Sequence, residues 1–104
     1  MKAYRVAFNE LEWQSPLPGV RFKVFRSGNK QIRLAEFSSE FVEPEWCDKG
    51  HVGYLLEGIL EIDFRGRVVT YKAGDALFIP PGAESGHKAR SLTAVTRLVL
   101  VEDV

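Results

Sequence analysis

One short stretch of this sequence concentrates the side chains that could do chemistry. Residues 43–51, EPEWCDKGH, contain the only cysteine, Cys47, one of the two histidines, His51, and the carboxylate of Glu45. Glu45 and Cys47 are two residues apart, so on an extended strand their side chains point to the same face. Asp48, Lys49 and Gly50 can turn the chain and return His51 beside Cys47. The sequence therefore predicts a pocket wall that carries titratable groups.

A thiolate, an imidazole and a carboxylate close to one another form a donor set for a divalent metal ion. Sulfur and nitrogen ligands in tetrahedral geometry suit Zn²⁺ best, and the residue types leave iron and nickel open. If Glu45 does not bind the metal, it could act as a general base. Plainer interpretations stay open as well: Cys47 as a small buried hydrophobe, and His51 hydrogen-bonded to Glu45 without metal.

The rest of the chain must position this stretch, and its pattern is that of an all-β protein. Short runs of alternating apolar and polar residues recur between turn signals roughly every ten residues, and no segment has a sustained helical period. Residues 20–25 and 31–37 are expected to form a hairpin across Gly28-Asn29, with Ile32 and Leu34 facing inward. The other predicted strands are residues 2–8, 52–57, 59–64, 68–71, 76–79, 87–90 and a buried last strand, 93–102, whereas residues 9–19 are expected to be a loop. Eight or nine short strands imply a sandwich or a barrel.

Two segments resemble motifs of the cupin superfamily. GDALFIPPG at residues 74–82 is similar to the start of the second cupin motif, and GYLLEG at residues 53–58 is similar to the end of the first. WCDKGH at residues 46–51 further resembles a small bacterial subgroup of uncharacterised cupins with a Trp/Cys-containing first motif. The resemblance implies one domain over residues 1–104, folded as a cupin-type double-stranded β-helix (jelly-roll) barrel. Because such proteins commonly dimerise, it also implies a homodimer.

The metal ligands of typical cupins are replaced here. The family uses a His-x-His pair, then a glutamate, then a histidine in the second motif. By this resemblance the pair falls on Glu45 and Cys47, the glutamate on His51, and the last histidine on Ser85, with His87 two residues further along. The resemblance thus implies a ligand set of Glu45, Cys47, His51 and His87. Two alternatives stay open at this end of the site: Ser85 completes it, or His87 is an exposed loop residue.

The balanced charge of the chain limits the partners that it could have. Fourteen basic residues offset fourteen acidic ones, and no basic patch is evident, so we expect neither nucleic acid nor membrane as a partner. No apolar run reaches the length of a membrane span. One cysteine cannot form an internal disulfide, and the N-terminus lacks the apolar run of a signal peptide. We therefore expect a cytoplasmic protein.

Three kinds of function remain compatible with the sequence. The first is a metal-dependent enzyme that acts on a small polar metabolite, with Glu45 as its base. The second is a metal-free domain that binds or senses a small ligand at the mouth of the barrel. The third is a structural role as a homodimer. Among the neighbouring side chains, Glu43 and Glu84 are expected to be solvated charges, and Trp46 and Tyr54 to be core or interface residues.

Overall fold

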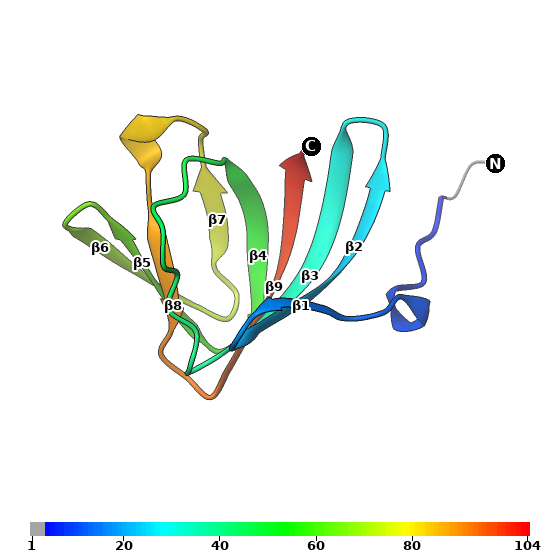
Figure 1. Cartoon of the computed structure of the whole chain (residues 1–104), viewed down its shortest axis with the longest axis horizontal. Coiled ribbons are helices and arrows are strands. Elements are labelled where there is room, and N and C mark those ends of the chain that lie inside the picture. The colour runs from blue at the N-terminus through cyan, green and yellow to red at the C-terminus, as the bar shows by residue number, and fades with distance from the viewer. Residues whose placement is uncertain (1–3) are drawn as a thin grey trace.

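The computed structural model describes residues 4–104, which form two antiparallel sheets that face each other (Figure 1). The larger sheet has the strand order β1-β2-β3-β9-β4-β7, and the smaller sheet has the order β6-β5-β8. The strands are β1 (Gln14–Leu17), β2 (Val20–Ser27), β3 (Lys30–Ser38), β4 (His51–Glu57), β5 (Ile59–Phe64), β6 (Arg67–Lys72), β7 (Ala76–Ile79), β8 (Lys88–Ser91) and β9 (Val95–Asp103). Two single-turn 3-10 helices, η1 (Phe8–Glu10) and η2 (Ala83–Ser85), complete the elements. The described residues include no helix long and apolar enough to cross a membrane.

The N-terminal part differs from the sequence prediction. Of the strand predicted over residues 2–8, residues 2 and 3 lie outside the described part, residues 4–7 form no strand, and Phe8 begins η1. Within the predicted loop, β1 forms even though it contains Pro16. β1 lies at the edge of the sheet, next to β2, where a residue without a backbone N–H need not break a ladder hydrogen bond.

The inward and outward positions of β3 are the reverse of the prediction. Ala35 is 1% exposed and belongs to the core, and it pairs with Leu98 of β9, which is also 1% exposed. Side chains that lie directly opposite each other in a sheet share a face. Because faces alternate along a strand, Ile32 and Leu34 point outward, and the charged residue between them, Arg33, points inward.

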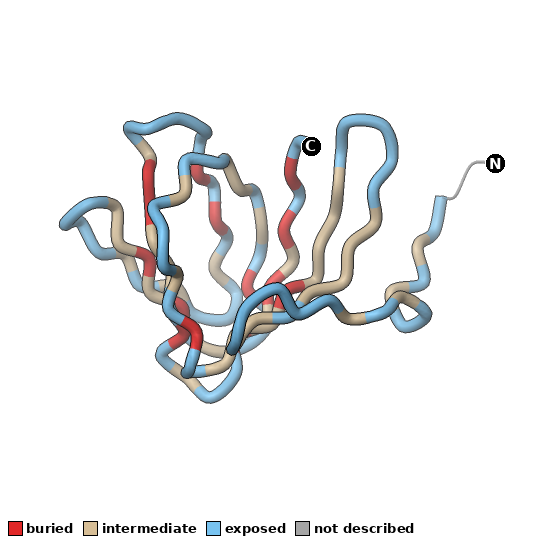
Figure 2. Tube along the Cα trace, viewed as in Figure 1, coloured by how far each residue is buried: buried red, intermediate tan, exposed pale blue. Residues whose placement is uncertain are grey.

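The core joins the two sheets. Figure 2 shows buried positions that alternate along β7 and β9. On β5, Leu60 and Ile62 are buried while Glu61 and Asp63 alternate with them on the opposite face, as the sequence predicts. β9 lies between β3 and β4, which fits the prediction of a buried last strand. The buried apolar cluster is made of Ala35, Leu55, Leu60, Ile62, Leu77, Ile79, Leu98 and Leu100.

A row of charges crosses the outer face of the larger sheet near one end. Glu36 on β3 accepts hydrogen bonds from Arg21 Nε on β2 (2.8 Å) and from Arg97 Nε on β9 (2.9 Å). Arg97 also lies 3.6 Å from the carboxylate of Glu57 on β4. Burial alone raises the pKa of Glu36, but the two guanidinium groups outweigh it and hold the pKa below its usual value.

Replacing Glu36 with glutamine tests this row. The folded pKa is lower than the unfolded one, so the carboxylate stabilises the fold above the unfolded value near 4.5 and ceases to do so as the pH falls through the folded pKa. At pH 7, Glu36→Gln should lower the free energy of unfolding by about 0.5–1 kcal/mol, and this difference should shrink in acid. Urea unfolding at pH 7, 5 and 3 measures it, with the exposed Glu84→Gln as control. A difference that is the same at every pH would contradict the prediction.

Candidate metal centre

The backbone holds Cys47 and His87 side by side. The two residues form an isolated antiparallel bridge, in which Cys47 N–H donates to His87 O (2.9 Å) and His87 N–H donates to Cys47 O (3.0 Å). A pair that exchanges both hydrogen bonds presents its side chains on one face. His87 is 3% exposed, so the alternative in which it is an exposed loop residue is wrong.

The turn after Cys47 returns His51 to the same place. Cys47 Sγ lies 3.8 Å from His51 Nε2, and the imidazole rings of His51 and His87 meet edge to face with centroids 5.1 Å apart. The ligand atoms of the three residues all lie within 4.8 Å of one another. Gly50 permits this path because a Cβ there would come within 2.9 Å of Pro81 Cδ. Local spacing and the backbone bridge thus bring Cys47, His51 and His87 into one cluster.

Each histidine uses its other ring nitrogen outside the cluster. His51 Nδ1 donates to Glu102 Oε2 (2.6 Å), and His87 Nδ1 donates to the backbone carbonyl of Ser85 (3.0 Å). These acceptors assign the proton to Nδ1 in each ring, which leaves the Nε2 lone pair for the cluster. Metal-binding histidines in proteins make the same kind of second hydrogen bond. The donor set therefore fits a metal ion, with Ser85 contributing its backbone and not its hydroxyl.

Glu102 carries a buried charge in the site. It is 8% exposed and accepts hydrogen bonds from His51, from Arg33 Nε (2.7 Å) and Nη2 (2.8 Å), and from Gln31 Nε2 (2.7 Å). Burial alone raises the pKa of Glu102, but the bonds from His51 and Arg33 outweigh it and hold the pKa far below its usual value. Sequence reasoning missed this residue. The sequence pattern that could have identified Glu102 is its position two residues after Leu100, because residues two apart on a strand share a face and Leu100 faces inward on β9.

Glu45 does not join the cluster formed by the described residues. Its side chain is exposed, although the residue borders the cavity described below. The carboxylate that hydrogen-bonds His51 is Glu102, so the alternative pairing of His51 with Glu45 is wrong. On the other face of this stretch, Arg65 Cζ and Lys88 Nζ lie over the ring of Trp46, at 4.6 and 4.8 Å from its centroid.

Glu43 is partly buried and close to the cluster, contrary to the expectation of a solvated charge. The chain near it runs along β8, and Glu43 N–H donates to Ala89 O (3.0 Å). Ala89 N–H donates in return to Glu43 Oε1 (3.0 Å). Burial raises the pKa of Glu43, and the hydrogen bond from Ala89 offsets only part of this rise. Glu43 is therefore a carboxyl group with a raised pKa beside the two histidines.

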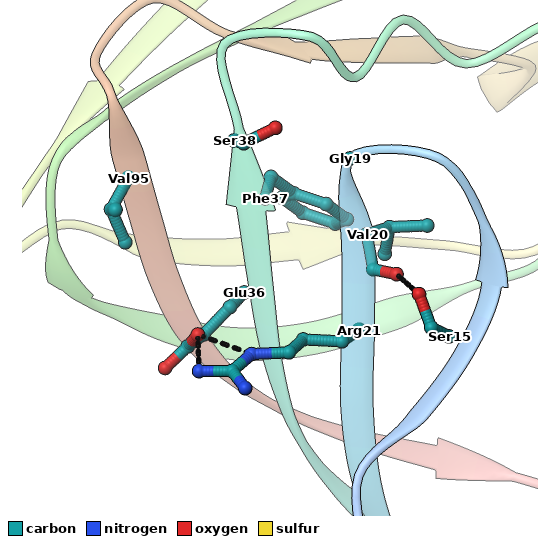
Figure 3. Close-up of a pocket in the computed structure, with 8 residues that line it drawn as sticks. All are labelled: Ser15, Gly19, Val20, Arg21, Glu36, Phe37, Ser38 and Val95. Atoms are coloured by element: carbon teal, nitrogen blue, oxygen red, sulfur yellow. Dashed lines mark hydrogen bonds and ion pairs between the residues drawn. The ribbon is translucent and has the colours of Figure 1, made fainter.

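The cluster lies on the wall of a cavity of about 1440 Å³ between the two sheets. The cavity is also bordered by Phe22 and Val24 of β2 and by Leu98 and Leu100 of β9. A separate hollow of about 230 Å³ lies at the β1–β2 edge and contains no member of the cluster (Figure 3). Its charged side chains, Arg21 and Glu36, are paired with each other. The large cavity is therefore the one that the candidate site serves.

Comparison with known proteins agrees with this fold. A cupin domain matches residues 40–102, whereas no curated protein matches the sequence. KdgF from Halomonas sp. is 20% identical, with 91% of this chain and 89% of that chain covered and a TM-score of 0.76. An RmlC-like cupin from Shewanella frigidimarina is 14% identical, with 98% and 91% covered and a TM-score of 0.78. The polyketide cyclase RemF from Streptomyces resistomycificus is 20% identical, with 98% and 80% covered and a TM-score of 0.79.

These identities show a shared fold and say nothing of a shared activity. The two facing antiparallel sheets are those of the double-stranded β-helix that the sequence motifs predict. Because the family match also covers more than half of the chain, this protein belongs to the cupin domain family.

Proposed function

We propose that Cys47, His51 and His87 bind one divalent metal ion and that this centre binds a small organic molecule in the cavity. The observation that carries the proposal is the approach of the three ligand atoms to within 4.8 Å of one another. In a tetrahedral zinc site, sulfur and nitrogen ligands lie about 3.5 Å apart, close to the 3.8 Å between Cys47 Sγ and His51 Nε2. Three protein ligands leave one position for a bound molecule, as in catalytic zinc sites. Zn²⁺ suits the set best, with iron and nickel as the other candidates.

A metal ion held here would polarise a carbonyl group or activate a water molecule. The protein's own residues divide the remaining tasks. Glu102 and the Ser85 carbonyl orient the imidazoles of His51 and His87. Glu43, whose pKa is raised, is the proton-transfer group that we favour over the exposed Glu45, because a raised pKa brings a carboxyl closer to the operating pH.

A metal-free binding or sensing domain is the second candidate function. The cavity of about 1440 Å³ supports it, because the barrel is not packed solid with side chains. The metal content of the protein separates the two candidates.

Elemental analysis of the purified, untagged protein is the direct test. We expect about one metal ion per chain, and a loss of zinc affinity of roughly 100-fold or more in Cys47→Ala and in His51→Ala, because each removes one of three ligands. Glu45→Ala is the matched control from the same stretch and should retain the metal. Competition with a chromophoric chelator measures the affinities. Wild-type protein that stays metal-free after incubation with Zn²⁺ or Fe²⁺ would contradict the metal centre and favour the metal-free binding domain.

The proton-transfer role of Glu43 has its own test in metal-free protein. The ¹³C carboxyl resonance that disappears in Glu43→Gln should titrate above pH 4.5. A folded pKa above the unfolded one means that ionising Glu43 opposes folding, so wild-type stability should decline as the pH rises from about 4.5 through the folded pKa. Glu43→Gln should lack this decline, and Glu45→Gln should keep it. A midpoint below 4.5 would remove the argument for Glu43.

We also propose that the protein forms a homodimer through the outer face of the larger sheet. Directly opposed apolar side chains cross this face on five strands: Phe25, Ile32, Val101, Val52 and Phe78. Phe78 is 81% exposed and Val52 is 47% exposed. On the same face Leu34 and Val99 separate this apolar row from the charged row at Glu36, and an apolar centre with a polar rim is typical of protein interfaces. A second copy fits because a row of this kind is complementary to itself about a twofold axis, and the net charge of zero does not oppose it.

Analytical ultracentrifugation of the wild-type protein and one variant tests the dimer. Phe78→Asp places a charge on the most exposed member of the apolar row, at its β7 end, and should give a monomer at tens of micromolar, where the wild type sediments as a dimer. Val68→Asp is the matched control, because Val68 is exposed on the smaller sheet. A monomeric wild type, or a dimer that withstands Phe78→Asp, would show that this face is not the interface.

A further inference from the structure

We infer that the molecule bound in the cavity has an apolar body of one or two rings, which lies along the inner face of β2 and β3, and a single polar end at the Cys47–His51–His87 cluster. The position of the polar end rests on the proposed function. The apolar body is inferred independently, from the residues of the opposite wall of the cavity. This ligand class differs from the small polar metabolite that the sequence suggested.

The inner face of β2 is the first observation. Val20, Phe22 and Val24 alternate inward on this strand and border the cavity, yet none of them is fully buried. Their cross-strand partners belong to β3, where Phe37 lies opposite Val20. Apolar side chains that face the interior of a barrel and remain partly open to it gain free energy when an apolar ligand covers them. This wall therefore favours apolar surface on the ligand.

Aromatic side chains extend the same wall. The rings of Phe37 and Phe41 are stacked, with centroids 4.6 Å apart and planes 12° apart, and both residues border the cavity. Phe22 lies beneath the guanidinium of Arg33, whose Cζ is 5.2 Å from its centroid. Aromatic groups prefer to pack against other aromatic groups in stacked or edge-on arrangements. Flat rings are thus a better match to this wall than branched aliphatic chains.

The polar groups on this side of the cavity already have partners within the protein. Arg33 directs Nε and Nη2 to Glu102, and Gln31 Nε2 donates to the same carboxylate. Arg26 Nε donates to Gln31 Oε1 (2.7 Å). Across the described residues, every buried side-chain nitrogen and oxygen has a hydrogen-bond partner. A molecule covered with hydroxyl groups would lose its hydration here without gaining partners, which is costly.

The size of the cavity gives the apolar body room. Its volume of about 1440 Å³ exceeds the roughly 300–1,000 Å³ that is usual for small-molecule sites. A small polar metabolite held at the metal centre would leave most of the apolar wall uncovered. A one- or two-ring body attached to the bound group would cover it.

Calorimetric titration with a series of carboxylates tests the inference. Acetate, benzoate and 2-naphthoate share one polar group and differ in apolar area, and gluconate is the polar control. We expect the affinity to rise about tenfold or more from acetate to benzoate and again to 2-naphthoate, with gluconate no tighter than acetate. Affinity that stays flat across the series, or gluconate as the tightest ligand, would overturn the inference.

Variants on β2 locate the apolar body. Val24→Trp projects an indole into the cavity from the apolar wall and should weaken 2-naphthoate at least tenfold, whereas Ser27→Trp, on the opposite face of the same strand, should leave it unchanged. Val24→Thr keeps nearly the same volume while adding a hydroxyl, so it should weaken 2-naphthoate several-fold and leave acetate unaffected, even if Val24→Trp fails to fold. Binding of 2-naphthoate that is unchanged in both Val24 variants would place the ligand elsewhere.

The titrations are run on zinc-loaded and on metal-free protein, which separates the two proposals. If the protein takes up no metal but still binds the larger ring carboxylates more tightly, the proposed metal centre is contradicted and the apolar wall is supported. If the protein binds zinc but shows no preference for the larger rings, the metal centre is supported and the inferred apolar ligand is contradicted.

Discussion

The buried carboxylate of Glu102 is the charge on which the arrangement of the site depends. It joins three strands, because it accepts from Arg33 and Gln31 on β3 and from His51 on β4, while it belongs to β9 itself. A buried charge is stable only when it is paired and hydrogen-bonded, so the larger sheet must bring all three strands into one register around it. The orientation of the His51 ring follows from that requirement. What holds His51 toward Cys47 is therefore a sheet-wide constraint as well as a local turn.

The cavity has two walls of different chemistry. Cys47, His51 and His87 form the wall that could hold a metal ion, and Glu43 lies beside them with a raised pKa. Val24 and its neighbours on β2 form the facing apolar wall, near which Arg26, Gln31 and Arg33 are hydrogen-bonded within the protein. One wall of the cavity can thus supply the reactive groups while the opposite wall supplies most of the binding affinity. Such a division suits a site in which covering an apolar body supplies the free energy that positions a reactive end.

The sequence predicts local features well and long-range ones poorly. Alternation and turn residues locate most strands, and the spacing of Cys47 and His51 identifies two members of the cluster before any fold is known. Glu102 escapes the same reasoning because its partners lie at least 51 residues away along the chain, and only the strand register brings them together. The inward side of β3 is predicted wrongly because the outer face of the sheet is apolar too. When both faces of a strand carry apolar residues, Ile32 gives no indication of which face meets the core.

The family match has a consequence for how this barrel could diversify. It spans residues 40–102, which include the whole Cys47–His51–His87 cluster and Glu102, but it leaves out β2 and β3. The segment that would perform a reaction and the segment that would select a ligand are consequently separate stretches of the chain. Substitutions in residues 20–38 could redirect the barrel to new molecules while its reactive centre stays the same. Arg33 and Gln31 are the exceptions, since they lie in the selecting segment yet hold the Glu102 carboxylate, and they tie the two stretches together.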